Sequence, residues 1–182
     1  MIRIGLFIVV SFYLLYVSRN ALKNPGVHGF YRFFVFEGIL VLVLVNHPYW
    51  FADPFAPLHI VSWFLLALSI GFIVESLRML KKYGGRRRRG EMPENFSFEN
   101  TIHVVETGIY RYIRHPMYAS LLFLGWGAFF KLITLPTTGL VLWITAFILA
   151  AARVEEKENR LFFGAEYTDY MRRTKMFIPW LK

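Results

Sequence analysis

The chain has 182 residues, of which 56% are hydrophobic and 19% aromatic, and its formal net charge is +9. The apolar share exceeds that of ordinary soluble domains, in which about 45–50% of residues are apolar even when glycine is counted. The absence of cysteine excludes disulfides, thiolate zinc sites and thiol nucleophiles. In a soluble protein the positive charge would favour a nucleic-acid ligand, so its distribution along the chain decides what it means.

Five apolar segments, taken in chain order, predict five transmembrane helices. A span needs roughly 20 mostly apolar residues to cross a hydrocarbon core of about 30 Å. The segments 58–77 and 132–152 reach that length, and 33–45 reaches it when extended to 31–47. The segments 4–18 and 117–130 are shorter. No small-residue cleavage site follows the first segment before Asn20, which favours a retained span over a cleaved signal peptide.

Lysine and arginine alternate between the connections, as a multi-pass protein requires. The first connection carries Arg19, Lys23 and Arg32, the second carries no lysine or arginine, the third is strongly basic, and the fourth holds Lys131 alone. The basic connections belong on the cytoplasmic side. This pattern predicts five spans in the inner (cytoplasmic) membrane, with the N-terminus outside and the C-terminus inside.

The run of four arginines at 86–89 lies in the third connection. With no soluble domain around it to shape a groove, we interpret it as a topology signal and a contact for anionic membrane lipids, and we expect no nucleic-acid partner. The predicted fold is therefore an all-α integral membrane protein with a single domain over 1–182. It comprises three helices within 1–80, a cytoplasmic loop at 81–115, a transmembrane hairpin at 116–152 and a cytoplasmic C-terminal segment at 153–182, to which the family resemblance described below assigns cofactor binding.

Two polar segments flank the last two spans, both on the predicted cytoplasmic side. In the first, Pro116 favours a helix start with His115 at its cap. The unpaired N–H groups of a helix start attract a carboxylate or phosphate, and Arg114, His115 and nearby tyrosines add donors. The alternative is that Arg114 and His115 only anchor the helix end at the membrane interface.

The second polar segment begins directly after the last span, with Arg153, Glu155 and Glu156. Carboxylates at that depth are costly and are often functional. One helical turn separates Arg153 from Glu156, so they form an internal ion pair, or else a carboxylate faces a polar cavity and neutralises a cationic ligand. Further along, Glu166, Tyr167 and Tyr170 suit an amphipathic helix lying at the interface. The histidines show no metal-ligand spacing, so we expect no metal site.

The order of these motifs resembles one known family. Gly108-x-Tyr-Arg-x-x-Arg-His-Pro-x-Tyr118, two closely spaced spans, Arg153-x-Glu-Glu, Phe163-Gly-x-Glu-Tyr-x-x-Tyr170 and a late Pro179 together resemble the isoprenylcysteine carboxyl methyltransferases. The related phospholipid N-methyltransferases share much of this pattern. The resemblance covers about 102–179 and implies a transferase that uses S-adenosylmethionine held in a cytoplasmic pocket.

Carried over residue by residue, the resemblance implies a set of cofactor-binding residues, namely Ile102, His103, Val104, Val105, Tyr110, His115, Pro116, Met117, Tyr118 and Glu155. Arg153 is the nearest match to the family's substrate-orienting arginine, although it lies two residues before the Glu pair rather than about four. Glu156 and His115 are the candidate bases if the acceptor carries a proton that must be removed. Arg153 and Glu156 are thus the predicted catalytic residues.

The predicted chemistry fits these residue types. Tyrosine faces stabilise a sulfonium by cation–π attraction. A desolvated glutamate pairs with an ammonium group, and the N-terminus of a helix binds a carboxylate. We expect a methyltransferase whose lipophilic acceptor, an isoprenylcysteine carboxylate or similar molecule, enters from the membrane lipids between the helices. The alternatives are an amine phospholipid or a small thiol as acceptor and, in another class, a non-catalytic scaffold or small transporter.

Overall fold

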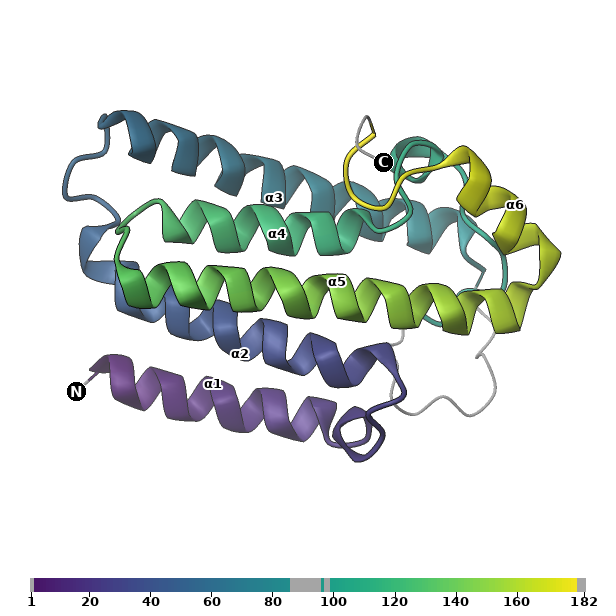
Figure 1. The fold of residues 1–182 in the computed structure, drawn as a ribbon, viewed down its shortest axis with the longest axis horizontal. Coiled ribbons are helices and arrows are strands. Elements are labelled where there is room, and N and C mark those ends of the chain that lie inside the picture. Colours follow the sequence, from purple (N-terminus) through teal and green to yellow (C-terminus); the bar gives the residue numbers. More distant parts are fainter. Residues whose placement is uncertain (1, 86–95, 97–98, 180–182) are drawn as a thin grey trace.

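The computed structural model describes residues 2–85, 96 and 99–179. Five long helices lie side by side, with alternating direction (Figure 1). They are α1 (Ile2–Ser18), α2 (His28–Asn46), α3 (Pro57–Tyr83), α4 (Pro116–Phe129) and α5 (Leu135–Phe163). The short helix α6 (Ala165–Arg173) follows, and single 3-10 turns occur at Ala21–Lys23, His47–Tyr49 and Gly108–Arg111.

The helices confirm the predicted all-α membrane fold. Three helical segments, His28–Tyr49, Pro57–Tyr83 and Leu135–Phe163, are long and apolar enough to cross a membrane, while α1 and α4 are shorter apolar helices. These are the five segments that the sequence predicts. The arginine run at 86–89, by contrast, lies outside the described residues.

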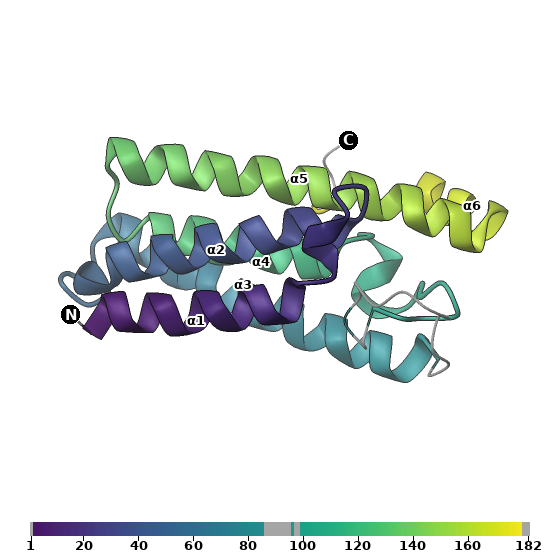
Figure 2. The ribbon, with the colours of Figure 1, turned by 90° about the horizontal axis from the view of Figure 1, so that it is seen from below.

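One end of the bundle carries additional structure that the other end lacks, and we call it the elaborate end. There α3 and α5 extend past α1 and α2, and α6 and the coil before α4 gather beside them (Figures 1 and 2). The 29 residues of α5 are about 43 Å long, well beyond a hydrocarbon core of about 30 Å. The first 20 residues of α5 suffice for the crossing, so Glu155 and Glu156 stand where the helix leaves the apolar layer.

The core lies between α2, α4 and α5, where fully buried side chains such as Leu42, Val141 and Ile148 interlock. Two glycines permit close helix contacts. A β-carbon on Gly38 of α2 would lie 2.7 Å from both Trp143 and Ile144 of α5, and one on Gly127 of α4 would lie 2.9 Å from Leu66 of α3. Neither position has room for a larger residue, so the spacing of the helices depends on both glycines.

The 14-residue helix α4 ends inside the bundle, and neighbouring helices complete its hydrogen bonds. The amide of Asn46 donates to the carbonyl oxygen of Ala128 at 2.8 Å, and the hydroxyl of Ser62 donates to that of Gly127 at 2.6 Å. The ring of His59 donates to the carbonyl oxygen of Lys131 at 3.1 Å. Carbonyl groups at a helix end are costly in an apolar medium unless they are paired, so these caps allow α4 to be short.

The contact of α2 with α5 gives a prediction about stability. Gly38→Ala forces the two helices apart and should destabilise the protein by roughly 1–3 kcal/mol, the usual cost of overpacking. Thermal unfolding in detergent, followed by circular dichroism, measures the change. Gly71→Ala is the matched control, because nothing lies within 4 Å of a β-carbon built there. If Gly38→Ala were as stable as Gly71→Ala, the proposed tight contact would be wrong.

Candidate active site

A cavity of about 420 Å³ lies at the elaborate end of the bundle. Helices α1, α2 and α3 supply an apolar wall that includes Leu14, Phe36 and Ile73, while the coil before α4 and the ends of α5 and α6 supply polar groups. The volume is in the range of small-molecule sites, which is about 300–1,000 Å³. An apolar wall facing a polar wall suits one ligand that has a polar and an apolar part, or a polar and an apolar ligand bound together.

The cavity brings together all but one of the predicted cofactor-binding residues. Those lining it are His103, Val104, Val105, Tyr110, His115, Pro116, Met117, Tyr118 and Glu155. Ile102 is not among the lining residues, although its backbone N–H donates to the carbonyl oxygen of Gly84 and so ties this segment to the end of α3. The assignment of a cofactor to these residues stays a prediction.

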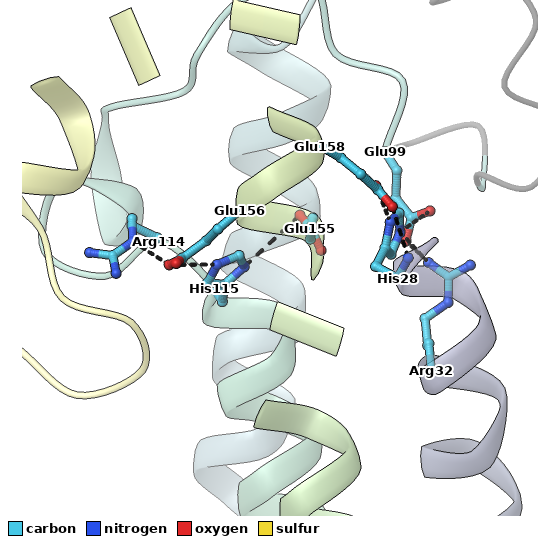
Figure 3. Close-up of polar contacts among 8 residues, drawn as sticks. All are labelled: His28, Arg32, Glu99, Arg114, His115, Glu155, Glu156 and Glu158. Carbon is cyan, nitrogen blue, oxygen red and sulfur yellow. Dashed lines mark hydrogen bonds and ion pairs between the residues drawn. The ribbon is translucent and has the colours of Figure 1, made fainter. Parts of the chain in front are cut away.

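Four charged residues on one side of the cavity form a connected group, which we call the first ionic cluster: Arg114, His115, Glu155 and Glu156. Figure 3 shows the four side chains converging, with Glu156 between Arg114 and His115. Its carboxylate accepts from Arg114 Nε at 2.7 Å and from His115 Nε2 at 3.3 Å. The other ring nitrogen, His115 Nδ1, lies 3.9 Å from Glu155 Oε1. Glu155 therefore has only one long ionic contact in the described structure.

The C-terminal coil holds this cluster in place. The backbone N–H groups of Arg114 and His115 donate to the carbonyl oxygens of Lys175 and Met176, at 2.8 and 3.1 Å. An isolated parallel bridge joins Ile113 to Lys175, and the ring of Phe177 packs against His115. His115 is also the N-cap of α4, which begins at Pro116. The position of the imidazole is thus fixed from three directions.

The predicted catalytic residues occupy different places. Glu156 is buried beside the cavity but does not line it, and Arg153 is exposed and does not line it either. Helix geometry explains this, since each residue turns about 100° and Arg153 faces away when Glu155 faces the cavity. The proposed Arg153–Glu156 ion pair is not the one formed, because Glu156 pairs with Arg114 and His115.

The structure adds a second ionic cluster that no sequence pattern predicts: His28, Arg32, Glu99 and Glu158 (Figure 3). Glu158 receives the backbone N–H of His28 at 2.9 Å and contacts the ring Nδ1 at 2.6 Å. Glu99 pairs with Arg32, and its Oε2 lies 3.5 Å from His28 Nε2. All four residues line the cavity. Glu158 lies one turn beyond Glu155, a helical spacing that was available in the sequence.

The charge on Arg32 decides the protonation of Glu99. Burial of this carboxyl acts to raise its pKa, but the Arg32 guanidinium and the hydrogen bond with His28 outweigh burial and hold the pKa at about 2, below the ordinary value of 4.5. Glu99 is therefore ionised at neutral pH and stays paired with Arg32 of α2.

Four buried tyrosines complete the polar wall: Tyr110, Tyr118, Tyr167 and Tyr170. The hydroxyl of Tyr170 donates to the carbonyl oxygen of Tyr110 at 2.7 Å, which joins α6 to the coil before α4. Burial raises the pKa of Tyr110, Tyr167 and Tyr170, so these phenols stay neutral. The Tyr118 hydroxyl is buried without a hydrogen-bond partner among the described residues, which marks it as a donor available to a ligand.

Comparison with known proteins gives the family. Residues 57–166, more than half of the chain, match the model of the phospholipid methyltransferases. The chain belongs to the phospholipid methyltransferase family. The matched residues include the coil that holds His115 and the part of α5 that carries Glu155, Glu156 and Glu158, so the polar wall of the cavity lies largely within the family region.

Individual relatives are similar over shorter stretches. The protein-S-isoprenylcysteine O-methyltransferase of Mus musculus is 34% identical over 85 residues, which are 46% of this chain and 30% of that protein. The protein of the same name from Saccharomyces cerevisiae is 37% identical over 81 residues, 43% of this chain and 33% of that protein. The predicted resemblance is thereby confirmed.

A second group of relatives is named for a different activity. Methanethiol S-methyltransferase 1 of Bradyrhizobium diazoefficiens is 32% identical over 75 residues, 40% of this chain and 25% of that protein. The match with each relative thus spans about a third or less of that relative's length. No solved structure gives a significant match to this chain. Within the described residues, no group of three or more His, Asp or Glu side chains is arranged to hold a metal ion.

The first ionic cluster gives a prediction about stability. Glu156→Leu leaves the Arg114 guanidinium buried without its carboxylate and should destabilise the protein by roughly 3–5 kcal/mol. Denaturant unfolding in detergent measures this, and Glu166→Leu, at an exposed position on α6, should change stability by only about 0.5 kcal/mol. Equal effects of the two substitutions would mean that the cluster does not contribute to the fold.

The second cluster gives a prediction about pH. Because the folded pKa of Glu99 is about 2 and the ordinary value is 4.5, its carboxylate contributes stability that is fully present above pH 4.5 and is lost as the pH falls towards 2. Relative to Glu99→Gln, the unchanged protein should therefore lose stability across that interval. Unfolding midpoints measured at several pH values test this, and parallel pH curves for the two proteins would contradict it.

Proposed function

We propose that this protein is an integral-membrane methyltransferase that uses S-adenosylmethionine to methylate a lipophilic acceptor, in the first place an isoprenylcysteine carboxylate or a molecule like it. The observation that carries the proposal is the cavity itself. It presents Glu155, His115 and four tyrosines on one wall and apolar side chains of α1, α2 and α3 on the other. The family and the names of the relatives support the same reaction class.

The residues fit the proposed methyl donor group by group. S-adenosylmethionine supplies an activated methyl group on a cationic sulfur, together with an amino-acid end and an adenine ring. Among the described residues, the one ion pair of Glu155 is the long contact with His115, so its carboxylate can pair with an ammonium group of the ligand. The start of α4 offers the N–H groups of Met117 and Tyr118 to a carboxylate. The Tyr118 hydroxyl, which has no hydrogen-bond partner among the described residues, offers a further hydrogen bond.

In this proposal the protein contributes mainly by positioning. The methyl carbon is already activated, so holding donor and acceptor in line supplies much of the acceleration. A carboxylate acceptor attacks as an anion, and no residue has to remove a proton. A thiol or amine acceptor must lose one, and His115 is the cavity residue suited to accept it, with Glu156 orienting its ring. Arg153 is exposed away from the cavity, and we assign it no contact with the acceptor.

Two other acceptors are candidates in this proposal. The methanethiol S-methyltransferases among the relatives favour a small thiol as the second candidate acceptor. The family description favours an amine phospholipid as a third.

The cavity lies at the end of the bundle that carries the basic first connection, so we propose that this end faces the cytoplasm, with the N-terminus on the other side of the cytoplasmic membrane. A polar methyl donor would reach it from the cytoplasm.

The proposal predicts that the purified protein binds S-adenosylhomocysteine, the demethylated form of the donor. Glu155→Gln removes the negative charge that would pair with the ammonium group, and it should weaken this binding by tenfold or more. Glu155→Ala combined with His115→Ala should abolish the binding. Isothermal titration in detergent measures the affinity.

Glu166→Ala is the control, since Glu166 is exposed and does not line the cavity. Intact, monodisperse protein that fails to bind S-adenosylhomocysteine would overturn the methyltransferase proposal and favour a non-catalytic scaffold or a transporter. Transfer of labelled methyl groups to prenylcysteine, thiol and phospholipid acceptors then ranks the candidate substrates.

A further inference from the structure

Arg32 is the arginine of the second ionic cluster, and it belongs to the part of the chain that precedes the family match at residue 57. It lies in the second turn of α2, only 4% exposed, and it lines the cavity. A guanidinium is almost never deprotonated, so a full positive charge stands in the cavity wall. Burying a charge is costly unless it is paired, so the groups that contact Arg32 decide its energetic cost.

The partners of Arg32 leave part of the guanidinium free. One terminal nitrogen pairs with Glu99 and lies 3.4 Å from His28 Nε2, and the ring of Phe96 covers the guanidinium plane at 4.0 Å. The Nε atom, by contrast, is buried and has no hydrogen-bond partner among the described residues. A buried unpaired donor costs about 1–3 kcal/mol, and more when it is charged. The cost is recovered if a ligand in the cavity accepts this hydrogen bond.

Arg114, His115 and His28, which also line the cavity, have partners within the described residues. Arg114 uses Nε for Glu156 and a terminal nitrogen for the carbonyl oxygens of Met171 and Thr174. His115 contacts Glu155 and Glu156. The carboxylate of Glu158 accepts the backbone N–H of His28 and contacts its ring Nδ1. Arg32 Nε is thus a charged donor that no described residue of the chain uses.

We infer that Arg32 binds the acceptor through Nε, and that the acceptor therefore presents an anionic oxygen or sulfur rather than an amine. Arginine pairs with anions along an edge of its planar group, and Glu99 holds the opposite side of the guanidinium in place. An amine phospholipid also carries an anionic phosphate, but its reacting group is an ammonium, and a guanidinium beside the reacting group repels that cation. The inference rests on the proposed function and narrows its acceptor class to a carboxylate or a thiolate.

The arrangement also separates the two ligands. The first ionic cluster, which we propose for the methyl donor, comes from the coil before α4 and from α5, whereas Arg32 comes from α2. Apolar residues of α1 and α2, among them Leu14, Val17 and Phe36, line the cavity together with Arg32. An acceptor with a lipophilic body and an anionic end has a matching surface there. In the transfer, the new bond forms between this anion and the methyl carbon while the carbon–sulfur bond of the donor breaks, with its electron pair left on sulfur.

The experiment measures binding as well as turnover. Purified protein saturated with S-adenosylhomocysteine is titrated with three probes, namely S-farnesylcysteine as the carboxylate, a long-chain alkanethiol, and phosphatidylethanolamine in mixed micelles. The neutral carboxamide of S-farnesylcysteine is the matched control ligand. We expect one of the two anion-forming probes to bind best, and for the carboxylate we expect the carboxamide to bind roughly ten- to a hundredfold more weakly.

The variants test whether Arg32 is responsible. Arg32→Met leaves Glu99 without its cation, so the double substitution Arg32→Met with Glu99→Gln removes the charged pair together. Both should weaken the best anionic probe by roughly ten- to a hundredfold, raise KM more than they lower kcat, and leave the affinity for S-adenosylhomocysteine unchanged. Arg32→Lys should recover part of the affinity. Arg172→Met, at an exposed position on α6, is the control.

Each other outcome overturns the inference. It is wrong if phosphatidylethanolamine binds best, if no probe binds, or if the double variant binds the best probe as tightly as the unchanged protein does. In all of these cases retained binding of S-adenosylhomocysteine leaves the proposed methyltransferase function standing. Loss of that binding in the unchanged protein would instead remove the proposed function itself.

Discussion

The structure depends on the requirement that a charge near an apolar layer be paired within the protein. Water is not available there to solvate a carboxylate or a guanidinium, so an unpaired charge costs several kcal/mol. The protein meets this requirement with Glu156, which joins the coil before α4 to α5 through Arg114 and His115. A second group of charges joins α2 to α5 and to Glu99. The cavity lies between these two cross-links, which hold its charged side chains in place.

The sequence predicted the helices well because apolar length is a direct consequence of bilayer thickness. Every predicted span corresponds to a helix of the structure, and the motif around His115 and Pro116 predicted the start of α4. Most of the predicted pocket also lies together, and Tyr110, His115 and Glu155 all belong to the region that matches the family. What no spacing rule gives is the rotation of each helix about its own axis.

That rotation explains what the sequence analysis missed. Arg153 is only two residues from Glu155, yet two residues turn an α-helix by about 200° and place the arginine outside the pocket. His28 and Arg32 are at the start of α2, where a basic residue is equally consistent with a topology signal. Their partners Glu99 and Glu158 are 67 to 130 positions away in the chain. Only the packing of α2 against α5 brings these residues together, and a single sequence does not reveal that packing.

The contacts that build the cavity also determine when it comes into existence. His28 meets Glu158, and Arg114 meets Lys175, so the wall closes only after segments from both ends of the described chain have come together. The apolar helices, in contrast, enter a bilayer as soon as each one is long enough. During synthesis the chain therefore becomes a membrane protein well before the cavity forms. A ribosome-bound or shortened chain would reside in the bilayer without the two ionic clusters and the cavity between them.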